Sequence, residues 1–234
     1  MASEPAGAAI AGIIAGSILF AVILAFVQVP LCGIGPTASK RLWTSILRWF
    51  KRGDVRPWTW DAVEEGVVYL SSLPRHIDEI TALQAPPHNI GAVISLIDKW
   101  EVKLPAEELH EVGIEWLHLP TPDYSAPSLR DILKGVHLII AQVSRGRGVL
   151  VHCNAGRGRS VVVVIAYLLA RNRLKHWTRD DAFEFVAARR DIAAIRALCG
   201  TRPQWRAVAA FARHLHLHPD EFRGAEIHDG AAVR

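Results

Sequence analysis

Residues 148–160 have the sequence GVLVHCNAGRGRS and bring a cysteine and an arginine together between two apolar runs. The first run, residues 148–151, is typical of a short buried strand, and the second, residues 161–170, is typical of a buried helix. A tight glycine-bearing loop at the start of a helix presents several backbone N–H groups and the positive end of the helix dipole. The stretch therefore predicts a binding site for a dianion such as phosphate.

Cys153 and Arg159 are the reactive residues that we expect in this loop. An ordinary cysteine is mostly protonated at neutral pH, but one at a helix N-terminus beside an arginine ionises and can attack. The planar guanidinium of Arg159 can bind two phosphate oxygens at once, a geometry that lysine lacks. We expect Cys153 to attack phosphorus and form a phosphocysteine. This chemistry requires a reducing compartment, and three cysteines offer no disulfide framework.

The other loop residues are expected to shape the phosphate site. His152 is predicted to orient the loop by hydrogen bonding, and Ser160 to stabilise the thiolate as it leaves the phosphocysteine. Local loop structure is the alternative interpretation for both. Arg157 adds a second cation beside the phosphate. The residues predicted to bind the substrate are His152, Asn154, Ala155, Gly156, Arg157 and Gly158.

The leaving alkoxide must gain a proton, so a general acid is required. Asp123 is our candidate, because it lies in a segment, residues 120–127, that contains three prolines and can be neither helix nor central strand. The same carboxylate can then act as base on the hydrolytic water. Asp98, which follows a predicted strand, is the alternative acid, and Asp131 is expected to be an exposed helix residue. No metal or other cofactor is predicted, since arginine, backbone amides and acid together balance the charge.

The rest of the chain alternates predicted strands and helices. Strands are expected at residues 67–70, 92–97, 114–119 and 148–151, and helices at 76–83, 128–142, 161–170, 179–190 and 203–214. This pattern predicts an α/β domain with a central sheet flanked by helices. We expect the domain to span residues 57–218 and to be followed by a flexible tail at 219–234.

The N-terminal part differs in character. No charged residue occurs between Glu4 and Lys40, and residues 10–29 contain only Ser17 and Gln28 as polar interruptions. About 20 apolar residues suffice for a helix to cross a bilayer, so residues 8–29, within an anchor at 1–36, are predicted to be a single transmembrane helix. A cleaved secretory signal is the alternative, but a basic n-region is missing.

A basic juxtamembrane segment, residues 37–56, follows the anchor. Its core, residues 40–52, has the sequence KRLWTSILRWFKR and is predicted to lie along the membrane surface. The net charge of +4 arises before Pro57, because basic and acidic residues are equal in number after it. We therefore expect an anionic membrane surface, and no nucleic acid, as partner. The positive-inside tendency puts the domain on the cytoplasmic or mitochondrial matrix side.

The pattern His-Cys, five residues, Arg-Ser at 152–160 resembles the signature motif of the cysteine-dependent protein tyrosine phosphatase superfamily. Residues 65–74, 119–135 and 188–202 are similar to the mitochondrial phosphatidylglycerophosphate phosphatase branch of the dual-specificity phosphatases. The resemblance covers about residues 57–216. It implies a dual-specificity phosphatase-like domain that removes the terminal phosphate from a phospholipid, in a protein of the inner mitochondrial membrane that faces the matrix.

The sequence is compatible with three functions. The first is a membrane-anchored phosphatase for an anionic phospholipid such as phosphatidylglycerophosphate, and the second is a protein phosphatase for phosphotyrosine, phosphoserine or phosphothreonine proteins. The third is a non-catalytic phosphate-binding module, against which Cys153, Arg159 and Asp123 argue. Arg157 favours a multiply anionic lipid. Asn154 departs from the lysine that lipid-acting relatives often have at this position.

Overall fold

The structure is a computed structural model that describes residues 57–192, 195 and 202–222. The predicted transmembrane segment at 8–29 and basic segment at 40–52 lie outside the described residues, as do Cys32 and Cys199. Among the helices that are described, none combines the length and the apolar character needed to cross a membrane.

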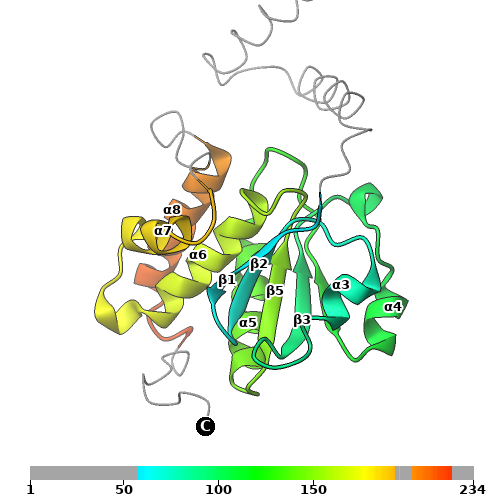
Figure 1. Cartoon of the computed structure of the whole chain (residues 1–234). Coiled ribbons are helices and arrows are strands. Elements are labelled where there is room, and N and C mark those ends of the chain that lie inside the picture. The colour runs from blue at the N-terminus through cyan, green and yellow to red at the C-terminus, as the bar shows by residue number, and fades with distance from the viewer. Residues whose placement is uncertain (1–56, 193–194, 196–201, 223–234) are drawn as a thin grey trace, which may run out of the picture. The chain divides into compact units, whose positions relative to one another are not determined.

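Five strands form one sheet in the order β1-β2-β5-β3-β4 (Figure 1). They span Trp60–Glu64 (β1), Val68–Ser71 (β2), Ile90–Ser95 (β3), Glu115–His118 (β4) and Gly148–His152 (β5). β1 runs antiparallel to β2, and every other neighbouring pair is parallel. β5 lies at the centre and is buried along its whole length, as its apolar run predicted. The parallel strands therefore direct their carboxyl ends, and the loop after β5, to one edge of the sheet.

Helices cover both faces of this sheet (Figure 1). They span Ile77–Thr81 (α3), Ala106–Glu111 (α4), Leu129–Val143 (α5), Arg159–Arg171 (α6), Arg179–Ala187 (α7) and Pro203–Leu217 (α8), with short 3-10 turns at Lys99–Glu101 (η1) and Arg173–Lys175 (η2). Apolar residues of α5 to α8 share one core cluster with the sheet, and Ile80 of α3 and Leu109 of α4 belong to a second cluster. The predicted α/β class with a central sheet flanked by helices is confirmed.

Helix α6 is the centre of the larger cluster. Every residue from Arg159 to Ala170 is buried, because α6 packs against β2 and β5 on one side and against α5, α7 and α8 on the others. A helix surrounded in this way has to be apolar on all faces, which explains its run of valines. Gly135 of α5 permits close approach, since a Cβ there would lie 2.7 Å from Val163 Cγ1. The first turn of α6 is consequently held firmly in the core.

Several boundaries differ from the predicted ones. β1, η1 and α4 were not predicted, because each is short and weakly patterned. Helix α7 ends at Ala187 and leaves Arg190 in the segment that follows. Helix α8 continues to Leu217, and beyond it Phe222, 3% exposed, belongs to the core cluster and contacts the ring of Phe211. The packed domain thus reaches Phe222, four residues into the segment expected to be a flexible tail.

Candidate active site

The loop of residues 153–158 joins β5 to α6 at the carboxyl edge of the parallel strands, where open α/β sheets bind their ligands. Cys153 is the first residue of this loop and is only 3% exposed. Its Sγ accepts hydrogen bonds from the Gly156 N–H at 3.3 Å and from the Ser160 hydroxyl at 3.4 Å. The loop therefore folds back over the sulfur and surrounds it with donors.

These donors change the acidity of the thiol. Burial alone raises the pKa of Cys153, because it disfavours a charge. The positive charge of Arg159 and the hydrogen bonds from Ser160 and Gly156 act in the opposite direction and together outweigh burial, so the pKa of Cys153 lies below its usual value. A thiol with a lowered pKa is a thiolate over a wider pH range, which is the form that attacks.

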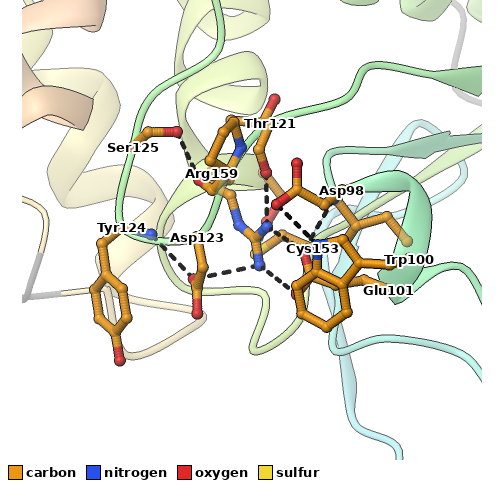
Figure 2. A network of polar contacts seen from close by, with 12 residues as sticks. Asp98, Trp100, Glu101, Thr121, Asp123, Tyr124, Ser125, Cys153 and Arg159 are labelled. Atoms are coloured by element: carbon orange, nitrogen blue, oxygen red, sulfur yellow. Dashed lines mark hydrogen bonds and ion pairs between the residues drawn. The ribbon is translucent and has the colours of Figure 1, made fainter. Parts of the chain in front are cut away.

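Arg159 extends its guanidinium between two carboxylates (Figure 2). Nη1 donates to Glu101 Oε2 at 2.8 Å, and Nη2 donates to Glu101 Oε1 at 3.3 Å, so one carboxylate binds both arms of the fork. Nη1 also donates to the Thr121 carbonyl at 2.8 Å. Burial lowers the pKa of Arg159, but Glu101 and the charges of Cys153 and Asp123 raise it overall. Arg159 is therefore charged and fixed in orientation.

Glu101 is a residue of this site that the sequence did not predict. It ends η1, is 3% exposed, and accepts the Asp98 N–H at 2.9 Å in addition to the two arms of Arg159. A carboxylate is buried this deeply only when it is paired. The sequence carries one weak signal, an acidic residue three positions after Asp98, which is the spacing of a helix capping box.

Asp123 lies on the loop between β4 and α5, as the prolines predicted, and the structure brings it to the reactive loop. Its Oδ1 lies 3.3 Å from Arg159 Nη2 and accepts the Tyr124 N–H at 3.0 Å. Its side chain is 30% exposed, so solvent reaches the carboxyl group. Gln204 of α8 holds the same loop by donating to the Ser125 carbonyl at 2.7 Å.

The alternative acid, Asp98, faces a different partner. Its Oδ2 accepts the indole N–H of Trp100 at 3.2 Å, at the start of η1 (Figure 2). The geometry therefore favours Asp123 over Asp98. Asp131 lies in the first turn of α5, where it accepts the Ser128 hydroxyl at 2.7 Å and belongs to the helix cap.

His152 is 2% exposed and lies behind the loop. Its Nδ1 lies 3.2 Å from the Cys153 carbonyl, which can only accept, so Nδ1 carries a proton. Nε2 lies 2.6 Å from Ser95 Oγ, and Ser95 Oγ also accepts the Trp116 indole N–H at 2.8 Å. Burial lowers the pKa of His152 to about 4, so the ring is neutral and Ser95 donates to Nε2. This chain of bonds fixes the carbonyl of Cys153.

The remaining predicted loop residues surround this arrangement. Arg157 is exposed and pairs with Asp191 at 3.1 Å between Nη1 and Oδ2, so its charge is shared with that carboxylate. Asn154 and Ala155 are exposed, and Gly158 precedes the first residue of α6. Within residues 57–192, 195 and 202–222, no three histidine, cysteine or carboxylate side chains cluster as a metal site.

A protein-family comparison identifies the domain. Residues 72–173 match a family model described as a polymorphic toxin system, DSP-PTPase phosphatase. These residues include the loop at Cys153 and the segment that carries Asp123. They form a phosphatase domain of the dual-specificity type. The resemblance expected from the motif at 152–160 is confirmed.

Two relatives of this dual-specificity phosphatase domain have names that belong to the predicted branch. The rat phosphatidylglycerophosphatase and protein-tyrosine phosphatase 1 is 32% identical over 133 residues, which are 55% of this chain and 66% of the relative. The Arabidopsis thaliana phosphatidylglycerophosphate phosphatase PTPMT2 is 34% identical over 130 residues, which are 54% of this chain and 53% of the relative. The chain thus spans between half and two thirds of the length of these two relatives.

The fold of the domain agrees with solved structures. A crystal structure of PTPMT1 is 27% identical with a TM-score of 0.59, and the match covers 69% of this chain and 98% of that chain. The structure of PTPMT1 in complex with PI(5)P is 25% identical with a TM-score of 0.58, covering 68% of this chain and 98% of that chain. The dual-specificity phosphatase domain therefore shares its fold with PTPMT1 over nearly the whole length of that crystal structure.

The buried His152 predicts a pH-dependent stability. Because its folded pKa is about 4, against about 6.5 in the unfolded chain, only the unfolded state binds this proton between these values. Stability contributed by His152 is therefore complete above pH 6.5 and is lost as the pH falls toward 4, by up to about 3 kcal/mol. Urea unfolding of the wild type and of His152→Asn at pH 7 and pH 4.5 measures this difference. An equal pH dependence in both proteins would contradict the assignment, and the exposed His110→Asn serves as control.

Glu101→Gln is expected to lower kcat/KM by roughly 10- to 100-fold. A neutral amide binds the fork of Arg159 less firmly, and its NH2 group would face the N–H donors of the guanidinium in place of an accepting oxygen. The effect should appear mainly in kcat. Glu108→Gln on the exposed side of α4 is the matched control, and we expect it to retain wild-type rates. A wild-type rate for Glu101→Gln would show that Arg159 needs no orienting carboxylate.

Proposed function

We propose that this chain is a membrane-anchored phosphatase that removes the terminal phosphate from an anionic phospholipid, such as phosphatidylglycerophosphate, through a phosphocysteine at Cys153. One observation carries the chemistry: the sulfur of Cys153 accepts two hydrogen bonds in a loop that ends at the charged, oriented Arg159. The lipid substrate is supported by the names of the rat and Arabidopsis relatives and by the PI(5)P complex of PTPMT1.

In the first step the thiolate of Cys153 attacks phosphorus, a P–S bond forms and the P–O bond to the lipid breaks. The loop N–H groups and the helix dipole of α6 stabilise the phosphoryl oxygens, while the fork of Arg159 binds two of them. Asp123, in its protonated form and released from its contact with Arg159, gives its proton to the departing alkoxide. The lipid alcohol then dissociates, and the phosphoryl group stays on sulfur.

In the second step a water molecule attacks phosphorus and the P–S bond breaks. The carboxylate of Asp123 takes the proton of the water, which restores the acid for the next cycle. The thiolate that leaves is stabilised by the Ser160 hydroxyl and the Gly156 N–H, which already donate to the sulfur. Inorganic phosphate is the product. His152 acts in neither step directly, since it holds the carbonyl of Cys153.

The acid assignment has its own test. We expect Asp123→Asn to lower kcat by about 100-fold and to remove the alkaline limb of the pH–rate profile, because that limb reports loss of the acid's proton. Asp98→Asn is the matched variant, and it should retain most of its rate. A larger loss in Asp98→Asn than in Asp123→Asn would reverse the assignment.

The membrane attachment is part of the proposal. It rests on the uncharged segment at 8–29 and on the basic segment at 40–52, with the domain on the cytoplasmic or matrix side. Protease treatment of sealed vesicles or mitoplasts tests this topology. Digestion of residues 57–234 only from the cytoplasmic or matrix side is the expected result, and digestion from the opposite side would contradict it.

Substrate choice is decided by comparing phosphate release by the full-length chain in detergent–lipid micelles. The substrates are phosphatidylglycerophosphate, PI(5)P, a phosphotyrosine peptide and a phosphothreonine peptide, with Cys153→Ser as blank. We expect kcat/KM for phosphatidylglycerophosphate to exceed that for either peptide by at least about tenfold. A preference for a peptide would instead assign a protein phosphatase, which the name of the rat relative also includes. If no phosphate were released from any of these substrates, the chain would be a non-catalytic phosphate-binding module.

A further inference from the structure

Arg190 reaches the back of the phosphate-binding loop from the segment that follows α7. Its side chain is 6% exposed. Nε donates to the Gly156 carbonyl at 2.7 Å, and Nη2 donates to the Ala155 carbonyl at 3.0 Å. Nη1 pairs with the carboxylate of Asp61 on β1. One buried guanidinium therefore binds two consecutive carbonyls of the loop and is itself held by the edge strand of the sheet.

The two carbonyls belong to peptide groups whose N–H groups matter for the chemistry. The Ala155 carbonyl and the Gly156 N–H are parts of one planar unit, so they point in opposite directions. The carbonyl is bound by Arg190, and the N–H donates to Cys153 Sγ at 3.3 Å. In the next unit, the Gly156 carbonyl is bound by Arg190 and the N–H belongs to Arg157. Binding the carbonyls from behind therefore turns both N–H groups toward the anion site.

The loop needs such a constraint at Gly156. This residue has a φ of +67°, and a Cβ there would lie 2.3 Å from the Ser71 carbonyl oxygen and 2.8 Å from Arg190 Nη2. Only glycine fits this space, but glycine also allows the flanking peptide groups to rotate more freely than any other residue does. The hydrogen bonds of Arg190 to the Ala155 and Gly156 carbonyls restrict this rotation and keep the two peptide groups in one orientation.

We propose that Arg190, held by Asp61, is a positioning residue that fixes two peptide groups of the loop in the orientation that binds the thiolate and the phosphate. The proposal deepens the proposed function and rests on it for the identity of the anion. Arg190 acts through the backbone of the loop and does not touch the substrate. A lysine at this position has a single ammonium group and lacks the fork that spans both carbonyls and Asp61.

The test measures the reactivity of the Cys153 thiol, in the full-length chain and without substrate turnover. The rate of alkylation of Cys153 by iodoacetate is followed against pH, with the site of modification read by mass spectrometry because the chain has three cysteines. We expect the midpoint of this rate–pH curve, which reports ionisation of the thiol, to rise by about one pH unit in Arg190→Ala. It should rise by a smaller amount in Arg190→Lys and Asp61→Asn. We also expect inorganic phosphate to inhibit these variants about tenfold less strongly.

Arg189→Ala is the matched control, because the neighbouring Arg189 donates to the Phe185 carbonyl and covers its ring on the exposed surface. It should keep the wild-type midpoint. An unchanged midpoint in folded Arg190→Ala would overturn the proposal, and if that variant does not fold, unchanged midpoints in both Arg190→Lys and Asp61→Asn would do so. A shifted midpoint in a chain that hydrolyses none of the substrates above would contradict the proposed function and leave the role of Arg190 intact.

Discussion

Cys153→Ser is expected to lower phosphate release by at least about 10⁴-fold, the largest effect of any single replacement in this domain. A serine hydroxyl stays protonated at neutral pH, whereas the surroundings of Cys153 lower the pKa of its thiol. The Gly156 N–H and the Ser160 hydroxyl would remain as donors around the new side chain. The variant should therefore still bind phosphate and substrate while it no longer forms a covalent intermediate.

Steady-state phosphate release and a binding assay with inorganic phosphate check this expectation together. The melting temperature is the control for folding, since the replacement changes one buried atom. If Cys153→Ser retained more than about one per cent of the wild-type rate, water rather than the cysteine would be the attacking group.

Arg159→Lys is expected to have the second-largest effect, a loss of roughly 10³-fold in kcat/KM. Lysine keeps the charge but loses the planar fork, which binds Glu101 through both arms and must bind two phosphate oxygens in the reaction. The buried carboxylate of Glu101 would also lose one of its partners. The loss should therefore include a lower kcat as well as weaker phosphate binding.

The double variant Arg159→Lys with Glu101→Gln tests whether Glu101 acts through Arg159 or independently of it. If the fork acts on the substrate through the orientation that Glu101 gives it, the second replacement should add little to the first. Fully additive losses would mean that Glu101 acts independently of Arg159. A wild-type rate for Arg159→Lys alone would rule out two-point binding of the phosphate.

The sequence predicted the parts of the site that are close together along the chain. The strand, the loop and the start of α6 lie within residues 148–171, and their apolar runs, glycines and reactive residues are all local signals. Asp123 was predicted as well, because prolines mark the loop that carries it. For the strand, the loops and the helix alike, the local residue pattern predicts the local conformation, and the structure agrees.

The residues that hold the site in place could not be predicted in this way. Glu101 is 58 positions from Arg159, and Arg190 is 34 positions from Gly156. Each looks like an ordinary charged surface residue in the sequence, and only the tertiary packing of η1 and of the segment after α7 brings them to the loop. The sequence pattern predicts a helix through Arg190, but α7 ends at Ala187, and the side chain of Arg190 can therefore turn inward.

The central claim is that the terminal phosphoryl group of the lipid is transferred to the sulfur of Cys153 before water hydrolyses it. Its most direct test is a rapid acid quench of the full-length chain with phosphatidylglycerophosphate labelled in the terminal phosphate, followed by mass spectrometry of the tryptic peptide 148–157. We predict that label appears on Cys153 within the first turnover and is absent in Cys153→Ser. Release of labelled phosphate with no label on Cys153 at any quench time would contradict the account.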